Sequence, residues 1–268
     1  MQYGVCCKPD MAEKVKEAGY QFIEGTVEAL LKPRSGDEAF DTSLAELKEA
    51  PLNCPIVNSF LPPDLKVTGP QVDLPALERY TRTTFGRAKA AGVETIVFGS
   101  GEARRIPEGF DRERAHGQLV DFCRMIAPVA SAHGVEIVVE PLNRNECNVL
   151  TSLGESADLV REVDHPAVRL LVDSYHLMLE DDSYEDIVIN ADLITHVHVA
   201  TEANRLPPGA EECDFFPFFE ALVRGGYDGR ISIEAKIQDP DRDLPKALSY
   251  YMKEMEKMAK EKISNQAT

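Results

Sequence analysis

Short runs of apolar and β-branched residues alternate along the chain with longer amphipathic stretches. The short runs read as buried strands, and the longer stretches repeat apolar positions every three to four residues, as helices do. The pattern predicts eight strands, at residues 2–7, 20–25, 54–60, 94–100, 136–141, 168–174, 194–200 and 230–236. It predicts helices at 10–19, 42–50, 74–92, 111–134, 153–164, 183–191 and 215–226, followed by a closing helix at 243–262.

Glycines mark the ends of several predicted helices, as at Gly92 and Gly134 just before the next strand. Alternating strands and helices imply parallel strands with helical crossovers, and eight such units fit a closed (β/α)8 barrel, the TIM barrel. An open doubly wound sheet is the alternative. No glycine-rich dinucleotide fingerprint follows the first strand and no linker divides the chain, so we predict a single α/β barrel domain over residues 1–268.

The structures of two further segments can be predicted. The polar insert at 61–75 is expected to form a loop over one end of the barrel. In the closing helix, Tyr251, Met255 and Met258 recur at helical spacing, which predicts packing on the barrel exterior. The same pattern suits burial against a second subunit, so a homo-oligomer stays open.

The charge balance excludes several partners. With 46 Asp and Glu against 29 Lys and Arg, the formal net charge is −17, which repels nucleic-acid phosphates and anionic membranes. The six cysteines form no C-x-x-C pair, nothing at the start resembles a signal peptide, and the apolar runs are shorter than the roughly 20 residues of a membrane span. We therefore expect a cytoplasmic protein with reduced thiols that acts on a small molecule.

Metal-binding side chains stand at the carboxyl ends of the last four predicted strands, where TIM barrels carry their chemistry. They are Glu140 in "VVEP", Asp173 in "LLVDS", His198 in "HVHVA" and Glu234 in "ISIEAK". One strand–helix unit separates each from the next, so four neighbouring strands each offer one ligand to a common point. Three buried carboxylates without a cation would be costly, and mostly oxygen donors favour Mn²⁺, Mg²⁺ or Co²⁺ over Zn²⁺.

A single acidic residue at a strand end is usually a helix cap, and only the set of four favours one divalent ion over that interpretation. His196 and His198 share one face of their strand, which we assign to the barrel interior. His196 lies nearer the barrel floor and is interpreted as a core histidine with a hydrogen-bond partner. Polar residues also follow the ligands in the sequence, among them Glu146, His176 and Arg205, and all are expected in loops.

The motifs "VVEPLNRNE", "LLVDSYHLMLED", "HVHVATEANRLPPG" and "GGYDGRISIEA", in this order, resemble the xylose-isomerase-like sugar isomerase/epimerase family. Within it, they are most similar to the ketose 3-epimerases of the tagatose and psicose type. The motifs cover residues 130–258, and the first half agrees only in its strand–helix rhythm.

The resemblance implies a set of roles. One divalent ion is bound by Glu140, Asp173, His198 and Glu234. Glu140 and Glu234 are also the acid/base pair, and the substrate is held by Glu146, His176 and Arg205. These roles suit epimerisation of a ketose at carbon 3. Removal of a proton beside a ketone gives an enediolate, which the metal stabilises. Inversion also needs a base and an acid on opposite faces of this intermediate.

Other functions remain open from the sequence. A hydroxypyruvate-isomerase-like enzyme could hold a carboxylate with Arg205 or the pair Arg104 and Arg105, and a dehydratase of an inosose-like cyclitol is a third option. An endonuclease-IV-like DNA repair enzyme is disfavoured by the net charge of −17 and the six histidines. A sugar-binding protein without activity would have no use for both glutamates.

The chain departs from the ketose 3-epimerases in one respect. These enzymes usually close large aromatic side chains over the sugar, whereas this chain has no Trp. The first and fourth strand ends read "GVCCKPD" and "FGSGEARRIPEGF". The distal carbons of the substrate are therefore expected to meet Cys6, Lys8 and Arg104 or Arg105, in a more polar pocket that suits a substrate of different length.

Overall fold

Eight parallel strands close into a barrel in sequential order, and the last strand pairs with the first. The computed structural model describes residues 1–266, and the side chains of residues 1–255 and 257. The strands are β1 (Gln2–Cys6), β2 (Phe22–Thr26), β3 (Ile56–Asn58), β4 (Thr95–Phe98), β5 (Glu136–Val139), β6 (Val168–Asp173), β7 (Ile194–Val199) and β8 (Arg230–Ile233). The predicted TIM barrel is confirmed.

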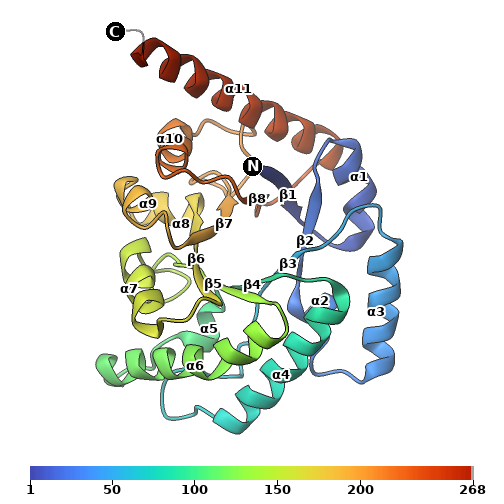
Figure 1. Ribbon diagram of the computed structural model, residues 1–268, viewed down its shortest axis with the longest axis vertical. Coiled ribbons are helices and arrows are strands. Elements are labelled where there is room, and N and C mark those ends of the chain that lie inside the picture. The colour runs from blue at the N-terminus through green and yellow to red at the C-terminus, as the bar shows by residue number, and fades with distance from the viewer. Residues whose placement is uncertain (267–268) are drawn as a thin grey trace.

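Helices surround the barrel and connect successive strands (Figure 1). They are η1 (Pro9–Met11), α1 (Ala12–Glu17), α2 (Val27–Leu30), α3 (Asp37–Glu49), α4 (Leu74–Ala91), α5 (Gly101–Arg104), α6 (Arg112–Ala132), α7 (Leu153–Val163), α8 (Ser174–Leu179), α9 (Glu185–Ile189), α10 (Phe216–Arg224) and α11 (Pro240–Gln266). Every predicted helix has a counterpart. The short helices α2, α5 and α8 were not predicted, because each begins within three residues of a strand end and is too short to show a period.

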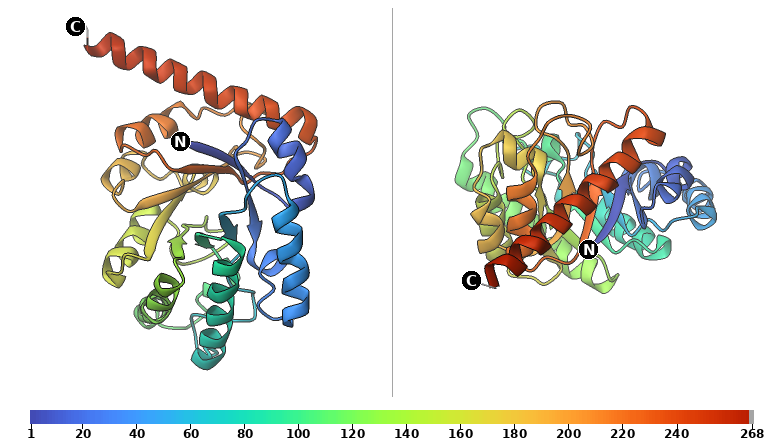
Figure 2. Two further views of the ribbon diagram at one scale, coloured as in Figure 1. Left: turned by 45° about the vertical axis from the view of Figure 1, so that its right-hand side comes forward. Right: turned by 90° about the horizontal axis from the view of Figure 1, so that it is seen from above.

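The glycines predicted to mark helix ends have a left-handed backbone conformation in the structure. Gly92 and Gly134 have φ values of 73° and 72°, which other residues rarely adopt. Helix α11 crosses the outside of the barrel beside β1 and extends past it (Figure 2). Tyr251 is buried there and stacks on Tyr3 with ring centroids 5.1 Å apart, and Met255 is half-buried. Met258 lies outside the residues whose side chains are described.

The inside of the barrel is apolar at the level below the strand ends. One cluster of buried side chains there consists of Phe22, Ile56, Val97, Val138 and Leu171. Side chains alternate along a strand, so the residue two positions further on faces inward again, at the carboxyl end of the barrel. These residues are Glu24, Asn58, Gly99, Glu140 and Asp173. An apolar layer thus closes the barrel beneath a polar one.

The insert at 61–75 lies over the carboxyl end of the barrel, as expected. The backbone N–H of Val67 donates to the carbonyl of Ala103, and the Thr68 hydroxyl donates to the carbonyl of Arg104. Pro62 and Pro63 line the cavity at that end. Among the helices of residues 1–266, none combines the length and the apolar character needed to cross a membrane.

Candidate metal centre and substrate cleft

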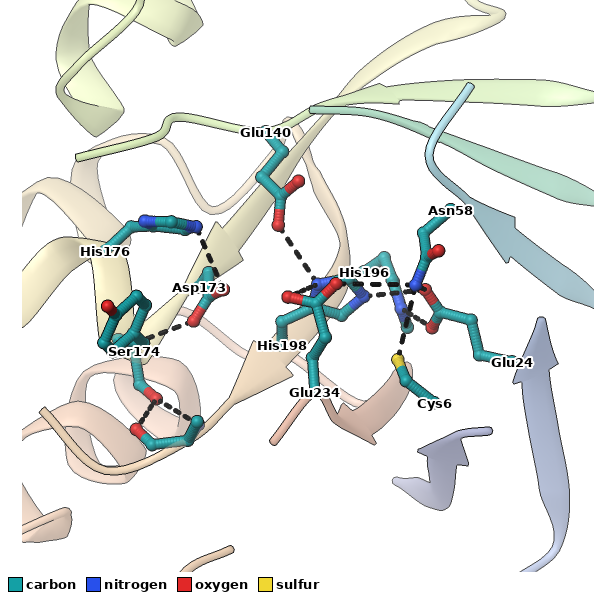
Figure 3. A network of polar contacts seen from close by, with 12 residues as sticks. Cys6, Glu24, Asn58, Glu140, Asp173, Ser174, His176, His196, His198 and Glu234 are labelled. Atoms are coloured by element: carbon teal, nitrogen blue, oxygen red, sulfur yellow. Dashed lines mark hydrogen bonds and ion pairs between the residues drawn. The ribbon is translucent and has the colours of Figure 1, made fainter. Parts of the chain in front are cut away.

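Four side chains from consecutive strands meet at the carboxyl end of the barrel (Figure 3). Asp173 ends β6, His198 lies in β7, and Glu140 and Glu234 directly follow β5 and β8. One ligand atom from each of the four lies within 4.8 Å of the other three. The structure therefore brings together the four residues that the sequence singles out, in a geometry that can hold one metal ion.

His198 and Asp173 direct specific atoms at the centre of this group. His198 Nδ1 lies 3.1 Å from Glu140 Oε1 and 3.6 Å from Glu234 Oε2. Asp173 Oδ1 caps α8 by accepting the N–H of Tyr175 at 2.8 Å. Asp173 Oδ2 is buried and has no hydrogen-bond partner among the residues that the structure describes. An unpaired carboxylate oxygen in such a place suits a metal ligand.

The electrostatics of the group call for a cation. Burial, with repulsion from Glu234 and Glu140, raises the pKa of Asp173 to about 7. Burial also raises the pKa of Glu140. Burial opposes ionisation of Glu234 too, but His198 and Arg205 hold its pKa at about 2. Three carboxylates and one imidazole give mostly oxygen donors, so the residues present fit one divalent ion.

Gly99, directly after β4, makes room for the Glu140 carboxylate. A Cβ atom at this position would lie 2.1 Å from Glu140 Oε2. The backbone of Gly99 does not have a positive φ, so the glycine is required for space. We expect Gly99→Ala to displace the carboxylate and to lower turnover on the active substrate about 100-fold, since misplacement by about 1 Å has that effect.

The matched control for this prediction is Gly86→Ala within α4, where an added Cβ meets nothing within 4 Å. Alanine is the better helix former, so this variant should keep full turnover and gain stability. Wild-type turnover in Gly99→Ala, measured on protein with an unchanged circular dichroism spectrum, would show that the position of Glu140 is not fixed by this contact.

Arg205 and Glu146 form the rim beside the four-residue group. Arg205 donates to Glu146 Oε1 at 3.2 Å and also pairs with Glu234. Its guanidinium lies 4.6 Å from the ring centre of Tyr175, and its backbone adopts a positive φ of 54°. Both Glu146 and Arg205 lie in loops, as expected, and both line the cavity.

His176 lies in α8 and not in a loop, which corrects the expectation from the sequence. Asp173 ends β6 and caps α8, so the residues that follow it form a helix without an intervening loop. The backbone and side-chain N–H groups of Asn143 both donate to His176 Nδ1, at 3.1 and 2.8 Å. Burial lowers the pKa of His176 to about 3, so the ring is neutral with its proton on Nε2, facing Asp173.

Arg104 does not face the substrate cleft, contrary to the expectation. Its side chain is fully buried and donates to the carbonyls of Phe98 and Glu140, at 2.8 and 2.6 Å. It therefore ties β4 to β5 and positions the strand end that carries Glu140. Arg105 donates to the carbonyl of Glu146 at 2.6 Å and does not line the cleft either, so the expectation is wrong for both arginines.

The first strands contribute site residues that the sequence reasoning missed. Glu24 in β2 is buried and lies 2.9 Å from His198 Nε2 and 2.9 Å from His196 Nε2. Asn58 in β3 donates to Glu24 Oε1 at 3.1 Å and to Glu234 Oε1 at 3.4 Å. His196, expected to be a core histidine with a hydrogen-bond partner, is buried and has two, since Nδ1 lies 3.1 Å from the carbonyl of Arg230.

The cleft above the group has two adjoining lobes that share Asn58, Ser59, Arg205 and Glu234. The lobes have volumes of about 540 and 440 Å³, within the range of small-molecule sites. Cys6 and Lys8 line the larger lobe, as expected for the distal part of a substrate. Charged, amide and hydroxyl side chains line both lobes together with apolar ones, and the polar groups can bind the hydroxyl groups of a sugar.

A sequence profile of known proteins now places the chain. The profile described as xylose isomerase-like TIM barrel matches residues 12–259. The chain belongs to this family. The resemblance drawn from the strand-end motifs is thereby confirmed for nearly the whole length, including the first half, where the motifs gave no detail.

Among curated relatives, the 3-dehydro-D-guloside 4-epimerase of Escherichia coli is 31% identical over 136 residues, which are 50% of this chain and 51% of that protein. The L-ribulose 3-epimerase of a Methylomonas species is 28% identical over 83% of this chain and 77% of that protein. A crystal structure of D-psicose 3-epimerase superposes with a TM-score of 0.80 at 20% identity, covering 93% and 98% of the two chains. The chain thus spans about half the length of the first of these relatives, and the structural likeness shows the shared fold.

Proposed function

We propose that the protein is a divalent-metal-dependent sugar epimerase that inverts carbon 3 of a ketose. The observation that carries the proposal is the placement of two glutamates, Glu140 and Glu234, within reach of one imidazole nitrogen in a buried cluster. Inversion needs one group to remove a proton from one face of a planar intermediate and another to return a proton to the opposite face. Two carboxylates from strands three apart in the barrel supply both groups.

The metal would be held by Glu140, Asp173, His198 and Glu234. A bound divalent ion would act as a Lewis acid that stabilises the negative charge developing on the substrate oxygens. The oxygen-rich donor set supports Mn²⁺, Mg²⁺ or Co²⁺.

The chain's own residues would carry the proton transfers. Arg205 and His198 keep Glu234 ionised, which suits it to remove the proton at carbon 3, whereas burial favours the protonated form of Glu140, which suits it to donate one. In the reverse direction the two exchange roles. His176 and Glu146 both line the cleft and would hold substrate oxygens.

Isotope incorporation tests this proposal. When a ketose substrate is turned over in deuterium oxide by the manganese-loaded protein, we expect deuterium at carbon 3 in the epimeric product. A panel of ketopentoses, ketohexoses and keto-glycosides serves as substrate, with protein treated with chelator as the control. Epimer formed without label at carbon 3 would contradict proton transfer at that carbon.

A second candidate is an isomerase of a short hydroxy-keto acid on the same metal site. Arg205 supports it, because a guanidinium at the rim of the cleft can hold a carboxylate in a bidentate manner. For this function, hydroxypyruvate and its homologues would be converted, and carbon 3 of the ketoses would stay unlabelled.

A further inference from the structure

Glu24 contacts two histidines beside the candidate metal centre (Figure 3). Its carboxylate is fully buried, with Oε1 2.9 Å from His198 Nε2 and Oε2 2.9 Å from His196 Nε2. Asn58 donates a third hydrogen bond to Oε1 at 3.1 Å. Burial of a carboxylate costs folding free energy unless hydrogen bonds compensate for the lost water. The two histidines and Asn58 supply these hydrogen bonds and hold the carboxylate in place.

The position of Glu24 determines which nitrogen of His198 carries the proton. A neutral imidazole has one N–H and one lone pair. Nε2 of His198 faces the Glu24 carboxylate, whereas Nδ1 faces Glu140 and Glu234. With a cation in the four-residue group, the ring would hold one proton; the acceptor at Nε2 places it there and leaves the lone pair on Nδ1, pointing at the cation.

We propose that Glu24 is a positioning residue for this centre: it fixes the Nε2–H form and the ring orientation of His198, so that Nδ1 is ready to bind a divalent cation. The proposal rests on the proposed function in that it requires a cation at the group of Glu140, Asp173, His198 and Glu234. A carboxylate that orients a metal-binding histidine in this way typically contributes 10- to 100-fold in metal affinity.

His196 holds Glu24 from the other side. Its Nδ1 faces the carbonyl of Arg230 and its Nε2 faces Glu24 Oε2, so both ring nitrogens point at oxygen atoms. A proton must therefore lie between His196 Nε2 and Glu24 Oε2, since two bare acceptors would repel each other. The chain of contacts runs from the β8 backbone through His196 and Glu24 to His198, and it makes the orientation of His198 depend on the barrel itself.

The hydrogen bonds of Glu24 determine which substitutions test the proposal. Glutamine at position 24 keeps an oxygen for the N–H of His198 and supplies an N–H to His196 Nε2, so every hydrogen bond survives without the charge. Methionine fills a similar volume but offers neither. Aspartate keeps the charge, but it is too short to reach both rings. Glu28→Met is the control, because Glu28 is an exposed carboxylate of the same cleft that contacts Tyr80 and no histidine.

The test is a titration of the purified, metal-free full chain with Mn²⁺. Binding is measured by isothermal calorimetry and by the electron paramagnetic resonance signal of free Mn²⁺. We expect Glu24→Met to weaken binding 10- to 100-fold, Glu24→Asp to have an intermediate effect, and Glu24→Gln and Glu28→Met to stay within about threefold of wild type. Nitrogen chemical shifts of the histidine rings in metal-free protein, followed upward in pH until His198 holds a single proton, should show that proton on Nε2 in wild type and Glu24→Gln, and its loss from Nε2 in Glu24→Met.

The outcomes separate this inference from the proposed function. Wild-type affinity in Glu24→Met, or in Glu24→Asp if the Met variant does not fold, would overturn the positioning role. A loss in Glu24→Gln as large as in Glu24→Met would overturn it too, and would identify Glu24 as a direct ligand. If wild-type protein binds no Mn²⁺, the proposed function fails, while the ring chemical shifts still decide whether Glu24 sets the form of His198.

Discussion

Glu234→Gln is expected to lower the turnover number for ketose epimerisation by at least about 1,000-fold. Proton transfer by a positioned carboxylate typically contributes 10²- to 10⁴-fold, and an amide cannot accept the proton of carbon 3. Arg205 and His198 hold the pKa of Glu234 at about 2, so wild-type protein presents the ionised carboxylate at every working pH. Initial rates with saturating Mn²⁺ measure the effect, and circular dichroism verifies the fold.

The matched variant Glu140→Gln sharpens this prediction. If the two glutamates serve opposite faces, each variant should still exchange the carbon 3 proton of one epimer with deuterium oxide while failing with the other. The two variants should differ in which epimer exchanges. Glu102→Gln, in the same cleft but paired with Arg105, is the control for lost charge and should keep wild-type rates. A fully active Glu234→Gln protein would contradict the assignment of Glu234 as a base.

The four candidate metal ligands all lie in the second half of the chain, and the local sequence pattern was sufficient to predict them. Asp173 ends its strand and His198 is the second-last residue of the next one, and one strand–helix unit separates them. Parallel strands in a closed barrel point their carboxyl ends the same way, so topology alone brings these side chains near one another. No long-range contact had to be known in advance.

In the first half of the chain, the role of the strand-end residue depends on a distant partner. Glu24 ends an apolar run too, but its meaning comes from His196, 172 residues further along the chain. The signal was present as an inward-facing acid two residues after Phe22, and it would have been found by applying the same strand-end rule to all eight strands. Arg104 and Arg105 could not be separated by pattern, because Arg104 ends the one-turn helix α5 and Arg105 follows it in an extended conformation, and only packing shows which is buried.

Removal of the metal is expected to destabilise the wild-type protein, and Asp173→Asn should relieve that cost. In the folded, metal-free protein, burial and the neighbouring carboxylates of Glu234 and Glu140 raise the pKa of Asp173 from its ordinary value of 3.8 to about 7. The folded state therefore holds this proton more tightly than the unfolded state, and stability is lost as the pH rises from about 4 through 7. At pH 8 the cost is a few kcal/mol at most, or on the order of 5–10 °C in the melting temperature.

Asparagine is the appropriate replacement because its side-chain oxygen can still cap α8 by accepting the N–H of Tyr175. Without metal at pH 8, Asp173→Asn should melt above wild type, and the gap should close near pH 4, where both side chains are neutral. Excess Mn²⁺, at about 1,000 times the dissociation constant, should stabilise wild type by about 4 kcal/mol and the variant by much less. Differential scanning calorimetry with and without metal measures all four states. A variant that melts below wild type at pH 8 in the absence of metal would mean that Asp173 is held by favourable contacts of its own, and the case for a cation at this cluster would lose its electrostatic basis.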